Sequence, residues 1–135
     1  MALEKYDDVD YHCGSETFAE NDLPMENGAT HIGFYMAWVV MKGRESEWLR
    51  ERAGEGIRKL RAREMTGREF LLDYCDGKLV SLFLNEEMDA FTRGYYEWHY
   101  IGDYMATVVN LGVYEVEDSW ENYEAMAGVL EKRYV

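Results

Sequence analysis

The stretch ATHIGFYMAWVVM, residues 29–41, decides the fold of this chain. Drawn as a helix, it is apolar around nearly its whole circumference, and it is too short to cross a membrane. It therefore predicts a buried central helix, which Lys42-Gly43 would end. Val39-Val40 would also suit a buried strand, but Met36 and Ala37 favour a helix.

The residues that follow carry the signals of shorter helices. Glu47–Arg52 and Glu55–Glu64 read as two surface helices, with a break at Gly54 and Gly56. Residues 66–69, Thr-Gly-Arg-Glu, form a capping-box pattern ahead of an apolar run. A helix is expected from there to the glycine of Asp76-Gly77. The apolar segment after it, residues 79–84, fits either a strand or a short helix.

The second half of the chain predicts two longer helices. After Asn85, which suits a helix N-cap, apolar residues recur at spacings of three and four: Met88, Phe91, Tyr95, Trp98, Ile101 and Met105. This period predicts that all six side chains lie on one inward face, which leaves Tyr96 and Tyr100 on the opposite side. Residues 113–116 alternate as in a short extended stretch, and Asp118-Ser119 is expected to cap the last helix.

The apolar residues of the segment 1–27 follow neither the period of a helix nor that of a strand. The segment holds three aromatic residues at irregular spacing, together with helix breakers, so we expect an irregular arm packed on the body. The chain contains no repeat, linker or low-complexity tract. We therefore predict a mainly α protein, a single compact helical domain over residues 1–135 with at most a short β element.

The charge is strongly acidic and unevenly placed. The net charge is −13, with −7 in residues 1–27, +4 in residues 42–68 and −10 in residues 69–135. Such a balance argues against nucleic acid and anionic membranes as partners. No apolar run reaches the roughly 18–20 residues of a membrane helix, and the N-terminus lacks the pattern of a signal peptide. With only two cysteines, a reducing cytoplasm is the expected location.

Motifs for catalysis are missing from the sequence. It has no GxSxG, Walker loop, GxGxxG, HExxH or CxxC, so we predict no catalytic residues, no cofactor and no metal. The nearest approach to a ligand set is Asp8, Asp10 and His12, which would share a face of an extended chain, with His31 joining from the central helix. The alternative interpretation is that both histidines anchor the arm by polar contacts.

Aromatic residues are unusually frequent, with eleven Tyr and four Trp in 135 residues. Tyr96 and Tyr100 either lie under the arm or form a surface patch, and exposed aromatic anchors are typical of protein interfaces. The candidate partner-binding residues combine these tyrosines with acids: Asp7, Asp8, Asp10, Tyr96, Tyr100, Glu115 and Glu117.

Several blocks spread over nearly the whole chain resemble an uncharacterised family of small acidic bacterial proteins, a domain of unknown function. The blocks are residues 5–8 (KYDD), 28–33 (GATHIG), 66–70 (TGREF), 85–87 (NEE), 116–123 (VEDSWENY) and 132–134 (KRY), together with His12, Ala37-Trp38, Phe91 and Tyr95-Tyr96. Members of that family resemble the immunity proteins of bacterial toxin–immunity pairs. The resemblance implies a protein that binds a protein rather than an enzyme.

The expected function is therefore to neutralise a cognate bacterial toxin, or another basic protein, by direct binding that occludes its active site. The expected oligomeric state is a monomer or homodimer. Two alternatives remain open at this point. One is a small-ligand or metal-dependent enzyme that uses His12, His31 and nearby carboxylates, and the other is an acidic mimic of nucleic acid.

Overall fold

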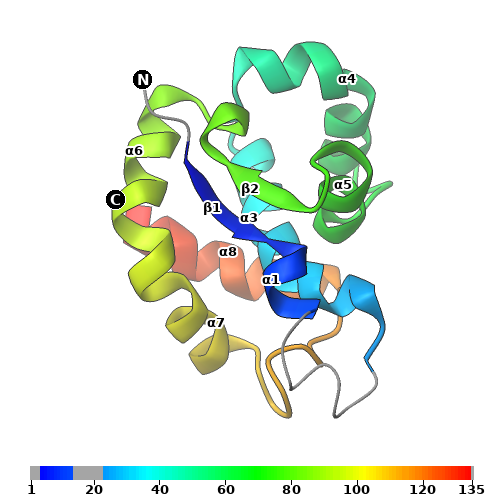
Figure 1. Ribbon diagram of the computed structural model, residues 1–135, viewed down its shortest axis with the longest axis vertical. Coiled ribbons are helices and arrows are strands. Elements are labelled where there is room, and N and C mark those ends of the chain that lie inside the picture. Colours follow the sequence, from blue (N-terminus) through cyan, green and yellow to red (C-terminus); the bar gives the residue numbers. More distant parts are fainter. Residues whose placement is uncertain (1–3, 14–22, 135) are drawn as a thin grey trace.

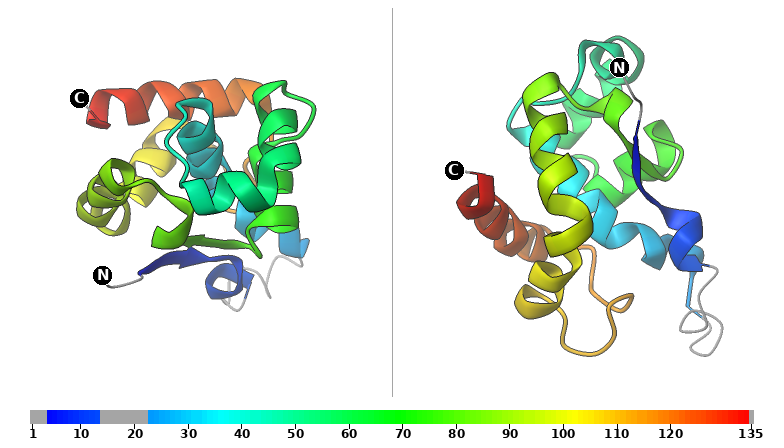
Figure 2. Two further views of the ribbon diagram at one scale, coloured as in Figure 1. Left: turned by 90° about the horizontal axis from the view of Figure 1, so that it is seen from above. Right: turned by 60° about the vertical axis from the view of Figure 1, so that its left-hand side comes forward.

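Helix α3, Thr30–Met41, runs through the middle of the computed structural model (Figure 1), which describes residues 4–13 and 23–134. Every residue from Thr30 to Val40 is buried, so the predicted central helix is confirmed. The remaining elements surround it on several sides. Seen from above, the two strands lie on one side of the molecule and α8 on the opposite side (Figure 2).

The other elements follow the chain in a simple order. They are β1 (Lys5–Asp8), α1 (Val9–Cys13), the 3₁₀ helix η1 (Met25–Ala29), α4 (Glu47–Arg61), α5 (Gly67–Tyr74), β2 (Lys78–Val80), the 3₁₀ turn η2 (Ser81–Phe83), α6 (Glu86–Tyr95), the π-helical turn η3 (Tyr96–Tyr100), α7 (Ile101–Thr107) and α8 (Trp120–Tyr134). The fold is mainly α with one small sheet, as the sequence predicts. Across the described residues, no helix has the length and apolar character that crossing a membrane requires.

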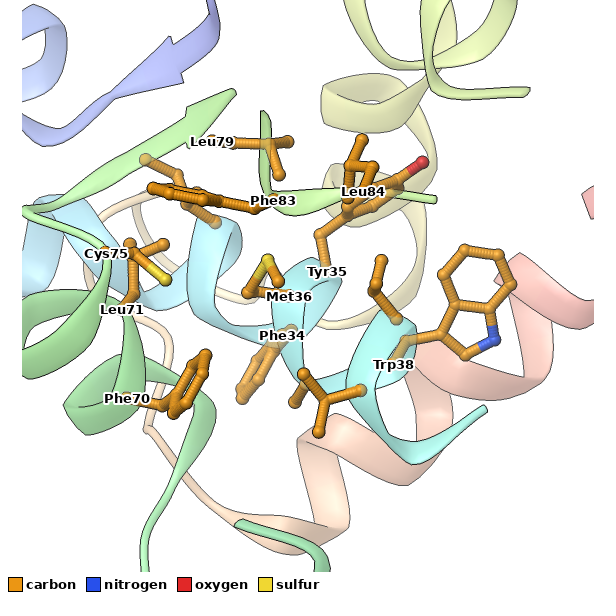
Figure 3. Close-up of a cluster of buried hydrophobic side chains, with 14 of the residues drawn as sticks. Phe34, Tyr35, Met36, Trp38, Phe70, Leu71, Cys75, Leu79, Phe83 and Leu84 are labelled. Atoms are coloured by element: carbon orange, nitrogen blue, oxygen red, sulfur yellow. The ribbon is translucent and has the colours of Figure 1, made fainter. Parts of the chain in front are cut away.

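The core forms where α5 crosses α3. Two glycines permit the close approach: a Cβ on Gly33 would come within 2.5 Å of the Arg68 backbone nitrogen, and one on Gly67 would strike the Gly33 carbonyl. Around this crossing, apolar side chains of α3, α5 and the β2–η2 segment interdigitate, with Phe34 and Phe70 lying near one another (Figure 3). The free thiol of Cys75 is buried in the same cluster.

The predicted helix starts agree with the structure. The capping box is present, with Thr66 accepting from the Glu69 backbone and Glu69 reaching back to Thr66. Ser46 and Asn85 cap α4 and α6, where their side chains accept from the backbone N–H groups of Leu49 and Met88. The two predicted surface helices are one helix, α4, with a kink at Ala53.

Regular structure replaces part of the arm that the sequence left irregular. Strand β1 pairs antiparallel with β2, Asp7 opposite Leu79 and Asp8 opposite Lys78, and α1 follows at once. The segment at residues 79–84, which fits either a strand or a short helix, contains both. Strand β2 ends at Val80, and the 3₁₀ turn η2 begins at Ser81. The alternating residues 113–116 form no strand.

The predicted inward face of the long second-half helix is wrong beyond Tyr95. Helix α6, η3 and α7 follow one another without a break, and the π-helical turn closes i→i+5 hydrogen bonds instead of i→i+4. The extra residue rotates everything after it. Met88 and Tyr95 face inward as expected, but the buried residues then become Tyr96, Tyr100 and Tyr104. The side chains of Trp98, Ile101 and Met105 are exposed instead.

Candidate functional site

Three chemically active side chains meet in the interior where the first helix packs near the start of α3. Asp7 comes from the end of β1, His12 from α1, and His31 from the first turn of α3. Asp7 and His31 are buried, while the His12 side chain keeps 18% of its surface exposed. We call these three residues the Asp7 cluster.

The polar atoms of the Asp7 cluster converge on one point. His12 Nε2 lies 2.7 Å from Asp7 Oδ1, and His31 Nε2 lies 3.2 Å from Asp7 Oδ2. The two Nε2 atoms are 3.2 Å apart, and the imidazole planes stand at 82° to each other. One carboxylate and two imidazoles in this arrangement could hold a metal ion.

Tyrosine side chains that surround the Asp7 cluster form hydrogen bonds to its residues. Tyr96 donates to Asp7 Oδ2 at 2.6 Å, and the Tyr114 hydroxyl lies 2.7 Å from His12 Nδ1. Tyr100 donates to the backbone carbonyl of His31. The register set by η3 thus supplies donors to a buried carboxylate and a buried carbonyl, groups that are costly to leave unpaired.

Burial and hydrogen bonding set the charges at this site. Burial alone would raise the pKa of Asp7, but the hydrogen bonds from His12 and His31 outweigh it and hold that pKa well below its usual range. Burial lowers the pKa of His31, which favours the neutral imidazole. Burial and the neighbouring Asp7 carboxylate raise the pKa of Tyr96 well above its ordinary value, so its hydroxyl remains a donor.

The predicted ligand set is corrected at its carboxylate. The sequence interpretation assumed an extended chain through Asp8, Asp10 and His12, but α1 begins at Val9, which breaks the alternation. Asp8 instead pairs with Lys5 at 2.9 Å, and Asp10 is exposed. Asp7 takes their place. The start of α1 lies in an acidic segment with irregularly spaced aromatic residues, so no pattern in the sequence predicts that Asp7 joins the two histidines.

The expectation of an exposed partner-binding surface is wrong for four of its residues. Asp7, Asp8, Tyr96 and Tyr100 are between 1% and 6% exposed, because β1 pairs with β2 and the π-helical turn rotates both tyrosines inward. They therefore cannot contact a partner in this conformation. The other three predicted residues, Asp10, Glu115 and Glu117, are exposed.

A different apolar surface lies open on the outer side of the same helix. Trp98 is 73% exposed, Ile101 40% and Met105 54%, and their spacing of three and four places them along one face. Leu111, in the segment after α7, is 82% exposed. We call Trp98, Ile101 and Met105 the apolar stripe. It is the surface that sequence periodicity assigned to the core.

The part of the chain around the apolar stripe is acidic. Residues 94–131 contain eight Asp and Glu residues and no Lys or Arg. Four of these acids pair with bases from elsewhere, namely Asp103, Asp118, Glu124 and Glu131. Within the described ranges, the other four have no ion-pair partner: Glu97, Glu115, Glu117 and Glu121. Three of them line a surface hollow together with Leu111.

Comparison with known proteins gives a family without an assigned activity. Residues 5–116 match the family model described as Domain of unknown function (DUF7832). The match spans the Asp7 cluster, the apolar stripe and the loop after α7. No curated protein and no solved structure matches the chain.

Proposed function

The chain belongs to the DUF7832 family of domains of unknown function, and we propose that it is a protein-binding module that takes a basic protein partner on the apolar stripe. The observation that carries this proposal is the row formed by Trp98, Ile101 and Met105, which lies exposed on a helix whose opposite face is buried. A contiguous exposed apolar row on an otherwise folded domain is a typical interaction site.

The chemistry of the stripe suits an interface. Trp is among the residue types that carry most binding energy in protein complexes, and Met adapts to irregular partner surfaces. The stripe lies on continuous helical backbone, with Trp98 in η3 and Ile101 and Met105 in α7, so little backbone entropy is lost when it docks. The segment that follows α7 carries a second exposed apolar side chain, Leu111, which lines a hollow together with Glu115 and Glu117, two of the predicted contact residues.

Charge selects the class of partner. Glu97, Glu115, Glu117 and Glu121 leave the vicinity of the stripe negative, and the whole chain carries −13. Such a field speeds association with a basic protein and disfavours acidic ones. Enzymes that act on nucleic acids carry basic surfaces where they bind phosphates, so a bacterial toxin of this kind is the proposed partner, with occlusion of its active site as the mode of neutralisation.

The location and assembly that go with this function are part of the proposal. A cytoplasmic protein would keep Cys13 and Cys75 reduced, and both are free thiols in the structure. With the stripe reserved for a basic partner, the free chain is proposed to be a monomer; a homodimer that pairs through the stripe is the alternative. Size-exclusion chromatography with light scattering at several concentrations distinguishes a self-pairing stripe from one reserved for another protein.

The test compares two exposed aromatic sites. The partner is crosslinked to the tagged chain in its own cells, identified by mass spectrometry and purified, and its Kd is measured for the wild-type chain and two variants. Trp98→Ala with Met105→Ala is expected to raise Kd about 30-fold, equivalent to roughly 2 kcal/mol. The matched control is Trp48→Ala, which changes a half-exposed tryptophan on α4, and it should leave Kd within about twofold.

Two readouts complete this test. Association should slow as salt is raised, and expression of the partner alone should arrest growth that the wild-type chain restores and the double variant does not. Equal affinity of the double variant and wild type would contradict the proposed surface. An acidic partner, or one that is harmless to cells, would contradict the toxin-neutralising part.

A further inference from the structure

We propose that the Asp7 cluster binds one divalent transition-metal ion of the zinc type through Asp7, His12 Nε2 and His31 Nε2. This inference is independent of the apolar stripe, because it concerns the interior face of the molecule. Three features of the site support it: the spacing of the ligand atoms, the hydrogen-bonding capacity of imidazole and the side chains that orient the ligands.

The spacing matches that of ligands around a small ion. Zinc lies about 2.0–2.1 Å from imidazole nitrogen and carboxylate oxygen, so two ligands of a tetrahedral zinc are about 3.3 Å apart. The two Nε2 atoms are 3.2 Å apart, and His31 Nε2 is 3.2 Å from Asp7 Oδ2. His12 Nε2 lies 2.7 Å from the other carboxylate oxygen, Asp7 Oδ1, so each imidazole faces one oxygen of Asp7, and this shorter distance would widen by roughly half an ångström around a bound ion.

Hydrogen bonding alone explains the convergence poorly. A neutral imidazole carries one N–H. If both Nε2 atoms donate to Asp7, two donors face each other at 3.2 Å, and if one Nε2 lacks its proton, that histidine has no hydrogen bond to Asp7. His31 Nδ1 is buried without a hydrogen-bond partner among the described residues, so this imidazole interacts with polar groups through Nε2 alone. A cation at the centre satisfies both Nε2 lone pairs and the carboxylate together.

The surroundings have the form of an outer ligand shell. With Nε2 on a metal, His12 carries its proton on Nδ1, where it donates to the Tyr114 hydroxyl at 2.7 Å. Tyr96 donates at 2.6 Å to Asp7 Oδ2, the carboxylate oxygen that faces His31. Such outer hydrogen bonds fix ring orientation and tautomer at metal centres. Two histidines and a carboxylate leave at least one coordination position for water or an added ligand.

A bound ion would join separate parts of the fold. Asp7 and His12 belong to the N-terminal segment, while His31 belongs to the central helix α3. Because the unfolded chain does not present this arrangement, metal binding would stabilise the native state by mass action. The expected consequence is a melting temperature that rises with metal concentration.

The experiment uses the full chain after treatment with EDTA and dialysis. Zn²⁺ binding is followed by isothermal titration calorimetry, and Co²⁺ binding by its visible d–d absorption, which is intense for four-coordinate sites. The variants are His12→Gln, chosen because His12 is the most exposed ligand, and the matched control His99→Gln, which changes the exposed histidine of η3. Circular dichroism confirms that both variants are folded.

We expect one Zn²⁺ per chain, a higher melting temperature with Zn²⁺ and intense Co²⁺ absorption. His12→Gln should weaken binding at least tenfold, and His99→Gln should bind as wild type does. Equal binding by the two variants would overturn the site. A wild-type chain that binds neither ion would overturn it too and would leave the histidines as hydrogen-bonded anchors of the N-terminal segment. Neither result affects the stripe, whose test uses other residues.

Discussion

Both faces of the helix at residues 96–105 carry large aromatic or aliphatic side chains, but one face is buried and the other is exposed. Tyr96, Tyr100 and Tyr104 are at most 6% exposed, whereas Trp98, Ile101 and Met105 are at least 40% exposed. The buried face holds the interior together and reaches the Asp7 cluster. Among residues 4–13 and 23–134, no side chain covers the exposed face. Aromatic content by itself therefore says little about where a binding surface lies.

The difference between the faces arises at a single turn. In an uninterrupted α-helix, the spacing of Tyr95, Trp98, Ile101 and Met105 would continue the inward face begun by Met88. The π-helical turn η3 adds one residue and transfers that role to the tyrosines. Turns of this kind occur often at functional sites, and here the turn both orients Tyr96 toward Asp7 and exposes Trp98.

The largest expected effect comes from adding one further residue to the π-helical turn. Insertion of one alanine after His99, an exposed residue of η3, should turn the following helix by about 100° and rotate Tyr100 and Tyr104 out of the core. Losing two buried aromatic side chains should cost at least about 4 kcal/mol of unfolding free energy. Urea unfolding measures this loss. The control His99→Ala should stay within about 0.5 kcal/mol of wild type, and an insertion variant as stable as this control would contradict the role of the π-helical turn.

A smaller effect separates the buried tyrosines by their hydroxyl groups. Tyr96→Phe removes a donor to the Asp7 carboxylate and should cost about 1.5–3 kcal/mol. Tyr104→Phe should be neutral or stabilising by up to about 1 kcal/mol, because the Tyr104 hydroxyl is buried with no hydrogen-bond partner among the described residues. Urea unfolding of both variants is the measurement, and the reverse order would refute this assignment of roles.

Local signals made much of the fold predictable. The apolar residues 29–41 and the capping box at Thr66 are read within one or two turns of chain, and both are confirmed. The small sheet depends on a pairing between Asp7 and Leu79, far apart in sequence, for which no local pattern exists. Amphipathic periodicity also assumes a constant number of residues per turn, so it could not anticipate η3.

The candidate sites were less predictable than the fold. The sequence identifies His12 and His31 as possible ligands but places Asp7 on the surface, because neither the pairing of β1 with β2 nor the start of α1 at Val9 has a local signal. Periodicity places the apolar stripe in the core, because it assumes a constant number of residues per turn and does not anticipate η3. Both errors follow from backbone geometry rather than from side-chain chemistry. Glu115 and Glu117 are exposed, which is the condition that the proposed partner-binding role sets for them.

The measurement that tests the central claim most directly is photo-crosslinking inside the cell from the two tryptophan positions used above. A photoreactive benzoylphenylalanine replaces Trp98 in one strain and Trp48 in another, and adducts are identified by mass spectrometry. We expect a single adduct with a basic protein from position 98 and none from position 48. An adduct from position 48 alone, or no adduct from position 98, would contradict the claim that the face exposed by the π-helical turn is the binding surface.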